Sequence, residues 1–305
     1  MRRLLLLFTT LAFAGPALAA QPGAAPWWIW PIALFVVSFA IGIIGVLAGV
    51  GGGVLFVPLV GGFFPFHLDF VRAAGLLLAL TGALSAAPGL LRGGLASLRV
   101  AMPLALVGSI TSIAGAWLGL ALPTHIAQTA LGGTILAIAV LMLRAEKSEF
   151  PEVSSQDRLS AALGLSGEFH DPATGRNFDW SAHRAPAGLV AFAGIGLLAG
   201  MFGLGAGWAN VPALNLLMGL PLKLAVGTSG LVLSVVDTSA AWVYINQGAV
   251  LPILVAPSIA GVMLGAKIGA RLLRIARAET VRKIVVGLLL VAGARALLKG
   301  LGIWS

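Results

Sequence analysis

The chain has 305 residues, of which 59% are hydrophobic and only 10% are charged, and its mean hydropathy is +1.03. Because soluble domains carry about 25% charged residues, this composition excludes an ordinary soluble protein and predicts a polytopic membrane protein. The net charge of +9 does not indicate a nucleic-acid partner, because the lysines and arginines stand in short loops between apolar runs, as they do in the cytoplasmic loops of membrane proteins.

The first twenty residues have the pattern of a secretory signal peptide or, if it is not cleaved, of a signal-anchor helix. They begin with Arg2 and Arg3, continue through a leucine-rich core and end in Ala17-Leu18-Ala19. This is the charged, apolar and small-residue order of a signal peptide. We therefore expect residues 1–20 to direct insertion into a bacterial inner membrane, with the mature N-terminus outside.

The remaining chain divides into two hydrophobic halves joined by a polar segment. In the first half, residues 28–143, helices are predicted at about 28–49, 53–65, 71–91, 100–120 and 126–143. Residues 144–186 are predicted to be a cytoplasmic loop that contains a small hairpin, because aromatic residues there alternate with Gly, Asp and Asn. In the second half, residues 187–300, helices are predicted at about 187–203, 207–219, 225–246, 251–270 and 282–299.

The two halves match at a constant offset of 154 residues, the difference between positions 58 and 212. This offset aligns GVGGGVLFVP, residues 49–58, with GLGAGWANVP, residues 203–212. Without any gap it also pairs Pro103 with Pro257 and Gly115 with Gly269. Glycine and proline punctuate backbone geometry, so their ungapped agreement predicts an internal duplication, which is typical of transporter folds.

The positions of lysine and arginine distinguish two topologies. If the short segments 53–65 and 207–219 cross the membrane, there are ten spans and the second repeat is inverted; otherwise there are eight spans and parallel repeats. Ten spans place thirteen basic residues inside and only Arg72, Arg295 and Lys299 outside, whereas eight spans place seven inside and nine outside. Because cytoplasmic loops are rich in these residues, we predict an all-α polytopic protein with two inverted repeats of about five transmembrane segments and glycine-broken helices.

The two glycine-rich breaks are the candidate substrate site. Glycine lets other atoms approach the backbone closely, and a broken helix leaves N–H groups that protein, water or ligand must satisfy within a membrane. In an inverted repeat the breaks would meet near the midplane, where free N–H groups and helix N-termini can bind an anion. The alternative is that the glycines only permit close helix packing.

Polar side chains within the predicted spans are concentrated in the second half. At the common offset, Asn210 corresponds to Phe56 and Asp237 to Ala83. Asp237 lies halfway along its predicted helix, and a carboxylate at that depth is a functional candidate. It either carries a proton during transport or forms a protonated, hydrogen-bonded contact between helices.

Two stretches resemble the TauE/SafE family of membrane permeases. The sequence GMFGLGAGWANVPALNLLMGLPLKLAVGTSG, residues 200–230, resembles the second repeat of that family, and GVLAGVGGGVLFVPLV, residues 45–60, resembles its first repeat. The resemblance covers roughly residues 35–300. It implies a secondary transporter that exports a small anion, sulfite or an organosulfonate, driven by the proton gradient. It also implies the following substrate-binding residues: Gly49, Gly51, Gly53, Pro58, Gly203, Gly205, Gly207, Asn210, Pro212, Thr228 and Ser229.

Other functions have less support in the sequence. A carrier of a cation or another small solute would need several inward carboxylates, histidines or thiols, and the predicted spans offer one acid and no cysteine. The GTSG sequence at Gly227–Gly230 matches the serine motif of rhomboid-type intramembrane hydrolases, but no histidine follows Ser229 to act as its base. A non-transporting scaffold remains an alternative. We expect no enzyme activity, cofactor or metal. The expected partners are a small anion and the lipid bilayer, with a homo-oligomer left open.

Overall fold

The computed structural model describes residues 26–48, 52–92, 94–144, 151, 156–171, 176–205, 207–272 and 278–303. The predicted signal segment, Gly49 and Gly51 therefore lie outside the described residues. The first half contains the helices α2 (Ile29–Ala48), α3 (Gly52–Phe63), α4 (Leu68–Arg92), α5 (Leu98–Ala121) and α6 (Thr124–Arg144). The second half contains α8 (Ala185–Phe202), α9 (Gly207–Pro212), the π-helix η1 (Ala213–Leu217), α10 (Leu222–Asn246), α11 (Pro252–Leu272) and α12 (Ala278–Gly300).

Several of these helices are long and apolar enough to cross a bilayer. Among the described residues, five such spans lie in α5, α6, α8, α10 and α11, and shorter apolar helices cover Ile29–Gly45 and Gly52–Phe63. A helix rises 1.5 Å per residue, so about 20 residues cross the 30 Å hydrocarbon layer. Large apolar side chains such as Val190 and Trp242 are exposed on the helices, as lipid contact requires. The chain is an all-α, multi-pass membrane protein.

The helices of the two halves have matching boundaries. The two 25-residue helices α4 and α10 begin at Leu68 and Leu222 and end at Arg92 and Asn246, so both ends differ by 154 residues. The first residues of α5 and α11, and those of α6 and α12, differ by the same number. The repeat predicted from glycine and proline therefore extends to the secondary structure.

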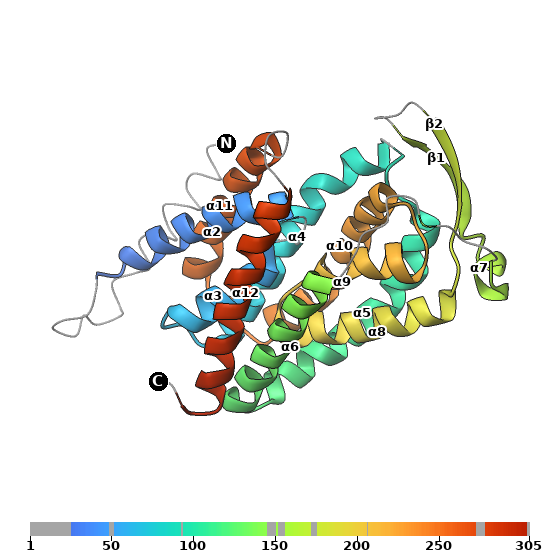
Figure 1. Cartoon of the computed structure of the whole chain (residues 1–305). Helices are drawn as coiled ribbons and strands as arrows, with labels where there is room; N and C mark the ends of the chain where they lie inside the picture. The colour runs from blue at the N-terminus through green and yellow to red at the C-terminus, as the bar shows by residue number, and fades with distance from the viewer. Residues whose placement is uncertain are drawn as a thin grey trace.

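Contacts between the halves repeat in the same way. Helix α2 packs along α11, and the corresponding helix α8 packs along α5 (Figure 1). A Cβ added at Gly42 would lie 2.6 Å from the carbonyl oxygen of Val262, and one added at Gly196 would lie 2.3 Å from that of Gly108. These two contacts are related by the offset of 154 with the halves exchanged. Helix backbones touch at both places, as small residues allow in membranes.

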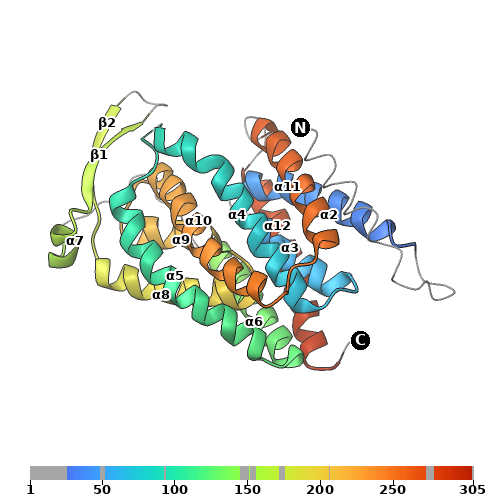
Figure 2. The ribbon, with the colours of Figure 1, turned by 180° about the vertical axis from the view of Figure 1, so that it is seen from behind.

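Helices α4 and α10 lie side by side and run in opposite directions (Figures 1 and 2). Ala73, near the start of α4, clusters with Tyr244, near the end of α10. At the other end, the backbone N–H of Ser97, just after α4, donates to the hydroxyl of Thr228 at 3.0 Å, near the start of α10. Corresponding helices of the two halves are thus antiparallel here.

A short helix and a hairpin connect the two halves. The helix α7 (Arg158–Ala162) precedes the antiparallel strands β1 (Ser166–Asp171) and β2 (Arg176–Ser181). The hairpin lies at one edge of the helical body, away from α2 (Figures 1 and 2). Asp157 fixes α7 to α8, because its carboxylate accepts hydrogen bonds from Ser160 and from the backbone N–H of Ala185.

Candidate functional site

The second glycine break is a true interruption of the helix. Helix α8 ends at Phe202, and α9 begins at Gly207. Gly203 and Gly205 both have a φ of +69°, in the left-handed region that glycine adopts without steric cost. In the first break, Gly53 lies in the first turn of α3, two residues beyond the undescribed Gly51.

The structure brings the described parts of the two breaks into contact. A Cβ added at Gly53 would lie 2.7 Å from the carbonyl oxygen of Leu204 and 2.9 Å from that of Gly75. One added at Gly75 would lie 2.4 Å from the carbonyl oxygen of Gly203. Real Cβ atoms essentially never approach within 3.0 Å, so close packing requires glycine at these positions. That packing, in turn, places the first break, the second break and α4 against one another.

Asp237 faces the second break from α10. Its side chain is fully buried, and its Oδ2 would lie 3.1 Å from a Cβ added at Gly205. The same added Cβ would lie 2.8 Å from the methyl group of Ala79 in α4. An ionised carboxylate is costly in such a place unless it is paired or protonated. The position therefore suits a group whose charge changes during a transport cycle.

Asn210 is a buried amide in the helix that follows the second break. Its side chain is fully buried in α9, and neither its Nδ2 nor its Oδ1 bonds to a described residue. The buried Nε1 of Trp208, two residues earlier, likewise bonds to none of them. A buried polar atom without a hydrogen bond costs about 1–3 kcal/mol, so these groups are suited to meet a ligand. The helix changes to π geometry directly after Pro212, as often happens at functional sites.

Three other residues that the sequence predicts for the substrate site, Thr228, Ser229 and Pro58, are buried in the structure. The hydroxyl of Thr228 accepts the hydrogen bond from Ser97, and a Cβ added at its neighbour Gly227 would lie 1.9 Å from the carbonyl oxygen of Leu95. Thr228 precedes Asp237 by nine residues, about 13 Å along a helix, so these two polar side chains lie at different levels of α10. Ser229 is buried beside it, and Pro58 is buried within α3.

Arg72 is a buried polar residue of α4 that the sequence did not single out as a site residue. Helix α4 begins at Leu68 rather than near residue 71, and Arg72 is only 1% exposed. Its Nη1 donates to Oδ1 of Asp69 at 2.9 Å and to the carbonyl oxygen of Gly119 at 2.8 Å. Its backbone lies against the second break, since a Cβ added at Gly203 would be 2.3 Å from the Arg72 carbonyl oxygen. The spacing of three residues between Asp69 and Arg72 was the signal in the sequence.

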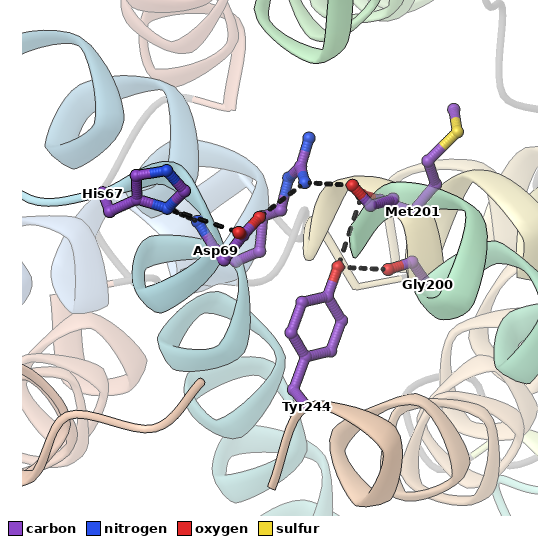
Figure 3. A network of polar contacts seen from close by, with 7 residues as sticks. His67, Asp69, Gly200, Met201 and Tyr244 are labelled. Atoms are coloured by element: carbon purple, nitrogen blue, oxygen red, sulfur yellow. Dashed lines mark hydrogen bonds and ion pairs between the residues drawn. The ribbon is translucent and has the colours of Figure 1, made fainter. Parts of the chain in front are cut away.

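A polar network surrounds this arginine at the ends of several helices. Nδ1 of His67 lies 3.3 Å from Oδ2 of Asp69. The hydroxyl of Tyr244 donates to the carbonyl oxygen of Gly200 at 3.0 Å, and that of Met201 lies 3.4 Å away (Figure 3). The carbonyls of the last helical turn have no partner within their own helix. Side chains of α4 and α10 therefore bond carbonyls near the C-terminal ends of α5 and α8.

A separate cavity of about 400 Å³ lies between α2, α3 and α12. Its lining consists of apolar side chains, among them Ile41, Leu55 and Phe63. It offers no hydrogen-bond donor to an anion. In the part of the chain that the structure describes, no group of three or more acidic or histidine side chains could hold a metal ion.

Comparisons with known proteins place the chain in a family. The family model described as "Sulfite exporter TauE/SafE" matches residues 34–296. A probable membrane transporter protein, YunE of Bacillus subtilis (strain 168), is 28% identical over 141 residues, which are 46% of this chain and 51% of that protein. The match thus spans about half the length of this curated relative. No solved structure matches. Because the family model covers most of the chain, the resemblance seen in the sequence is confirmed, and this multi-pass membrane protein belongs to the TauE/SafE family.

Proposed function

We propose that the protein is a secondary transporter that exports a small anion across a bacterial inner membrane, with sulfite or an organosulfonate as its substrate class. The family description names sulfite export, and the curated relative is named a probable membrane transporter. Export would be coupled to proton movement.

One observation carries the proposal: two helix breaks from different halves of the chain touch each other beside a buried carboxylate. Gly53 packs on Leu204 of the second break, and Gly205 of that break packs on Asp237. In transporters built from repeats, substrates bind where broken helices of the two repeats meet. The contact between the breaks is therefore the proposed substrate site.

The proposed mechanism is alternating access by two inverted repeats with ten spans. The antiparallel packing of α4 on α10 supports this arrangement, because it sets corresponding helices of the halves in opposite directions. The exchange of contacts between α2–α11 and α8–α5 supports it as well. Movement of one repeat against the other would then expose the site first to one side of the membrane and later to the other.

Within the site, each polar group has a distinct proposed role. The Nδ2 of Asn210 would donate a hydrogen bond to the anion, together with backbone N–H groups of the breaks. Asp237 would carry the proton, since it is a fully buried carboxylate that faces the second break. A protonated Asp237 would let the anion approach without electrostatic repulsion.

Anion-dependent stability of purified protein tests this proposal. We would compare wild type, Asn210→Ala and the control Asn246→Ala, because the exposed amide of Asn246 donates to the carbonyl of Trp242 within its own helix. The panel would hold sulfite, thiosulfate, sulfoacetate, sulfate and acetate, with potassium and zinc salts for the cation alternative. A ligand that binds only the folded protein raises its melting temperature.

We expect one sulfur anion to stabilise wild type and Asn246→Ala. In Asn210→Ala the affinity should fall roughly tenfold or more, because a hydrogen bond to a charged group contributes about 1.5–3 kcal/mol. Stabilisation by a cation alone, or by none of the anions, would exclude the proposed anion site. Stabilisation of wild type that Asn210→Ala leaves unchanged would remove Asn210 from the site.

A further inference from the structure

The buried guanidinium of Arg72 uses only one of its three nitrogens within the described structure. Nη1 makes both hydrogen bonds, to Asp69 and to the carbonyl oxygen of Gly119. Nε and Nη2 are buried and make no hydrogen bond with any described residue. In a guanidinium group, the N–H bonds of Nε and Nη2 point in the same direction and form a fork that matches two oxygens on one central atom.

This unused fork belongs to a residue that touches the proposed substrate site. The backbone of Arg72 lies against Gly203, and α4 carries Gly75 and Ala79 along the same contact with the second break. Around the arginine, Tyr244 bonds the carbonyl groups that end α8. Arg72 is therefore a buried cation placed next to the meeting point of the two breaks.

A purely structural role for Arg72 would explain the hydrogen bonds of its Nη1 but not the burial of its Nε and Nη2. To bond the carbonyl of Gly119 at the end of α5, a single donor nitrogen is enough, and a lysine could supply it. A buried cation is costly unless it is paired, yet its one acidic partner, Asp69, is 26% exposed. A structural role therefore does not explain why the two donors that could bind two oxygens together, Nε and Nη2, are buried without a hydrogen bond to any described residue.

We infer that Arg72 binds the transported oxyanion through Nε and Nη2, while Asp69 and Gly119 hold the guanidinium in position through Nη1. This inference deepens the proposed function and rests on it. It assigns to the site a bidentate preference for an oxyanion, such as sulfite or a sulfonate, over a spherical anion such as chloride. His67 and Asp69, whose side chains are 54% and 26% exposed, lie between Arg72 and the surface at the start of α4, so the anion passes them on one side of the membrane.

The test compares Arg72→Lys with wild type and with the control Arg295→Lys. Lysine keeps the charge and a donor for Asp69 and Gly119 but lacks the fork. Arg295 is a suitable control because its Nε already donates to the carbonyl oxygen of Gly62 at 2.8 Å, and its guanidinium lies over the ring of Phe63. Sulfite and chloride affinities would be measured by titration calorimetry on each folded variant.

We expect Arg72→Lys to bind sulfite about tenfold more weakly or worse, with a much smaller change for chloride, while Arg295→Lys binds both like wild type. A second measurement uses wild type alone, so it gives a result even if Arg72→Lys does not fold. In wild type labelled with ¹⁵N at arginine Nε, addition of sulfite should shift one buried Nε resonance, and addition of chloride should not.

The outcomes separate this inference from the proposed function. If wild type binds no oxyanion, the proposed function fails and the inference fails with it. If wild type binds sulfite but no arginine Nε resonance shifts, or if Arg72→Lys binds sulfite as tightly as wild type, the inference alone is overturned. Equal weakening of sulfite and chloride binding would show that Arg72 contributes charge only, and it would refute the bidentate contact.

Discussion

Replacing Gly75 by alanine should push α4 away from the second break and from α3. The new Cβ would lie 2.4 Å from both the carbonyl oxygen of Gly203 and a methyl carbon of Val57, so each neighbour must move by at least 3.0 − 2.4 = 0.6 Å to reach the shortest contact that real Cβ atoms show. One obstacle is backbone, and Gly203 is itself held against the carbonyl of Arg72. Overpacking of this kind costs about 1–3 kcal/mol.

The same helix supplies a matched control in Gly82→Ala. A Cβ at Gly82 would meet nothing within 4 Å. Both substitutions gain helix propensity, up to about 1 kcal/mol each, so their difference isolates the cost of overpacking. We expect Gly82→Ala to equal or exceed wild type in stability, and Gly75→Ala to be about 1–3 kcal/mol less stable than Gly82→Ala.

Unfolding of purified protein in mild detergent, followed by fluorescence of the eight tryptophans, measures this difference. The same samples should be titrated with sulfite, since displacement of Gly203 alters the proposed site. Gly75→Ala should lose the sulfite-dependent stabilisation that Gly82→Ala retains. If the two variants unfold at the same temperature, the backbone contact between α4 and the second break does not exist as described, and the reasoning about the meeting of the breaks fails.

Two further predictions concern parts of the structure outside the breaks. Three hydrogen bonds hold the pKa of Asp157 below its ordinary value of 3.8. The strongest comes from the Ser160 hydroxyl, and the others come from the backbone N–H groups of Ala185 and Ser160. A lowered pKa adds stability above pH 3.8 that is lost as the pH falls through the lowered value. Melting curves of wild type and Asp157→Asn should therefore differ at neutral pH and converge in acid; a constant gap down to pH 2 would contradict this. Thr228→Val removes the acceptor for the Ser97 N–H and should cost about 1 kcal/mol in unfolding free energy. The control Thr238→Val should not, because the exposed hydroxyl of Thr238 donates to the carbonyl of Ser234 within its own helix. Equal losses would refute the role of Thr228.

Local sequence signals were enough to predict the helices. Apolar runs with glycine and proline between them placed all ten helical segments within a few residues of their observed positions. These signals work because a membrane-spanning segment must satisfy its own backbone hydrogen bonds. The break at Gly203 and Gly205 was also visible, since positive φ angles favour glycine.

Contacts between distant residues could not be predicted in this way. The sequence placed Arg72 at the start of a predicted helix and on the outer side of the membrane, but it did not show that this side chain is buried and bonds the carbonyl of Gly119, 47 residues away. The hydroxyl of Thr228 accepts a hydrogen bond from the backbone of Ser97, 131 residues earlier, and the sequence did not indicate this contact. In both cases the partner comes from a distant part of the chain, so no local pattern contains it. The functional roles of Asn210 and Asp237 stay predictions.

The matching helix lengths of the two halves have an energetic consequence. A backbone made of two equivalent halves can adopt two conformations that are related by exchanging the halves, and with identical side chains these would have equal free energy. Here Val226 occupies the position equivalent to Arg72, and Ala83 the position equivalent to Asp237. If the protein works by the proposed alternating access, the side chains at which the halves differ would set its resting orientation, and a bias of a few kcal/mol would be enough to leave the opposite orientation sparsely populated.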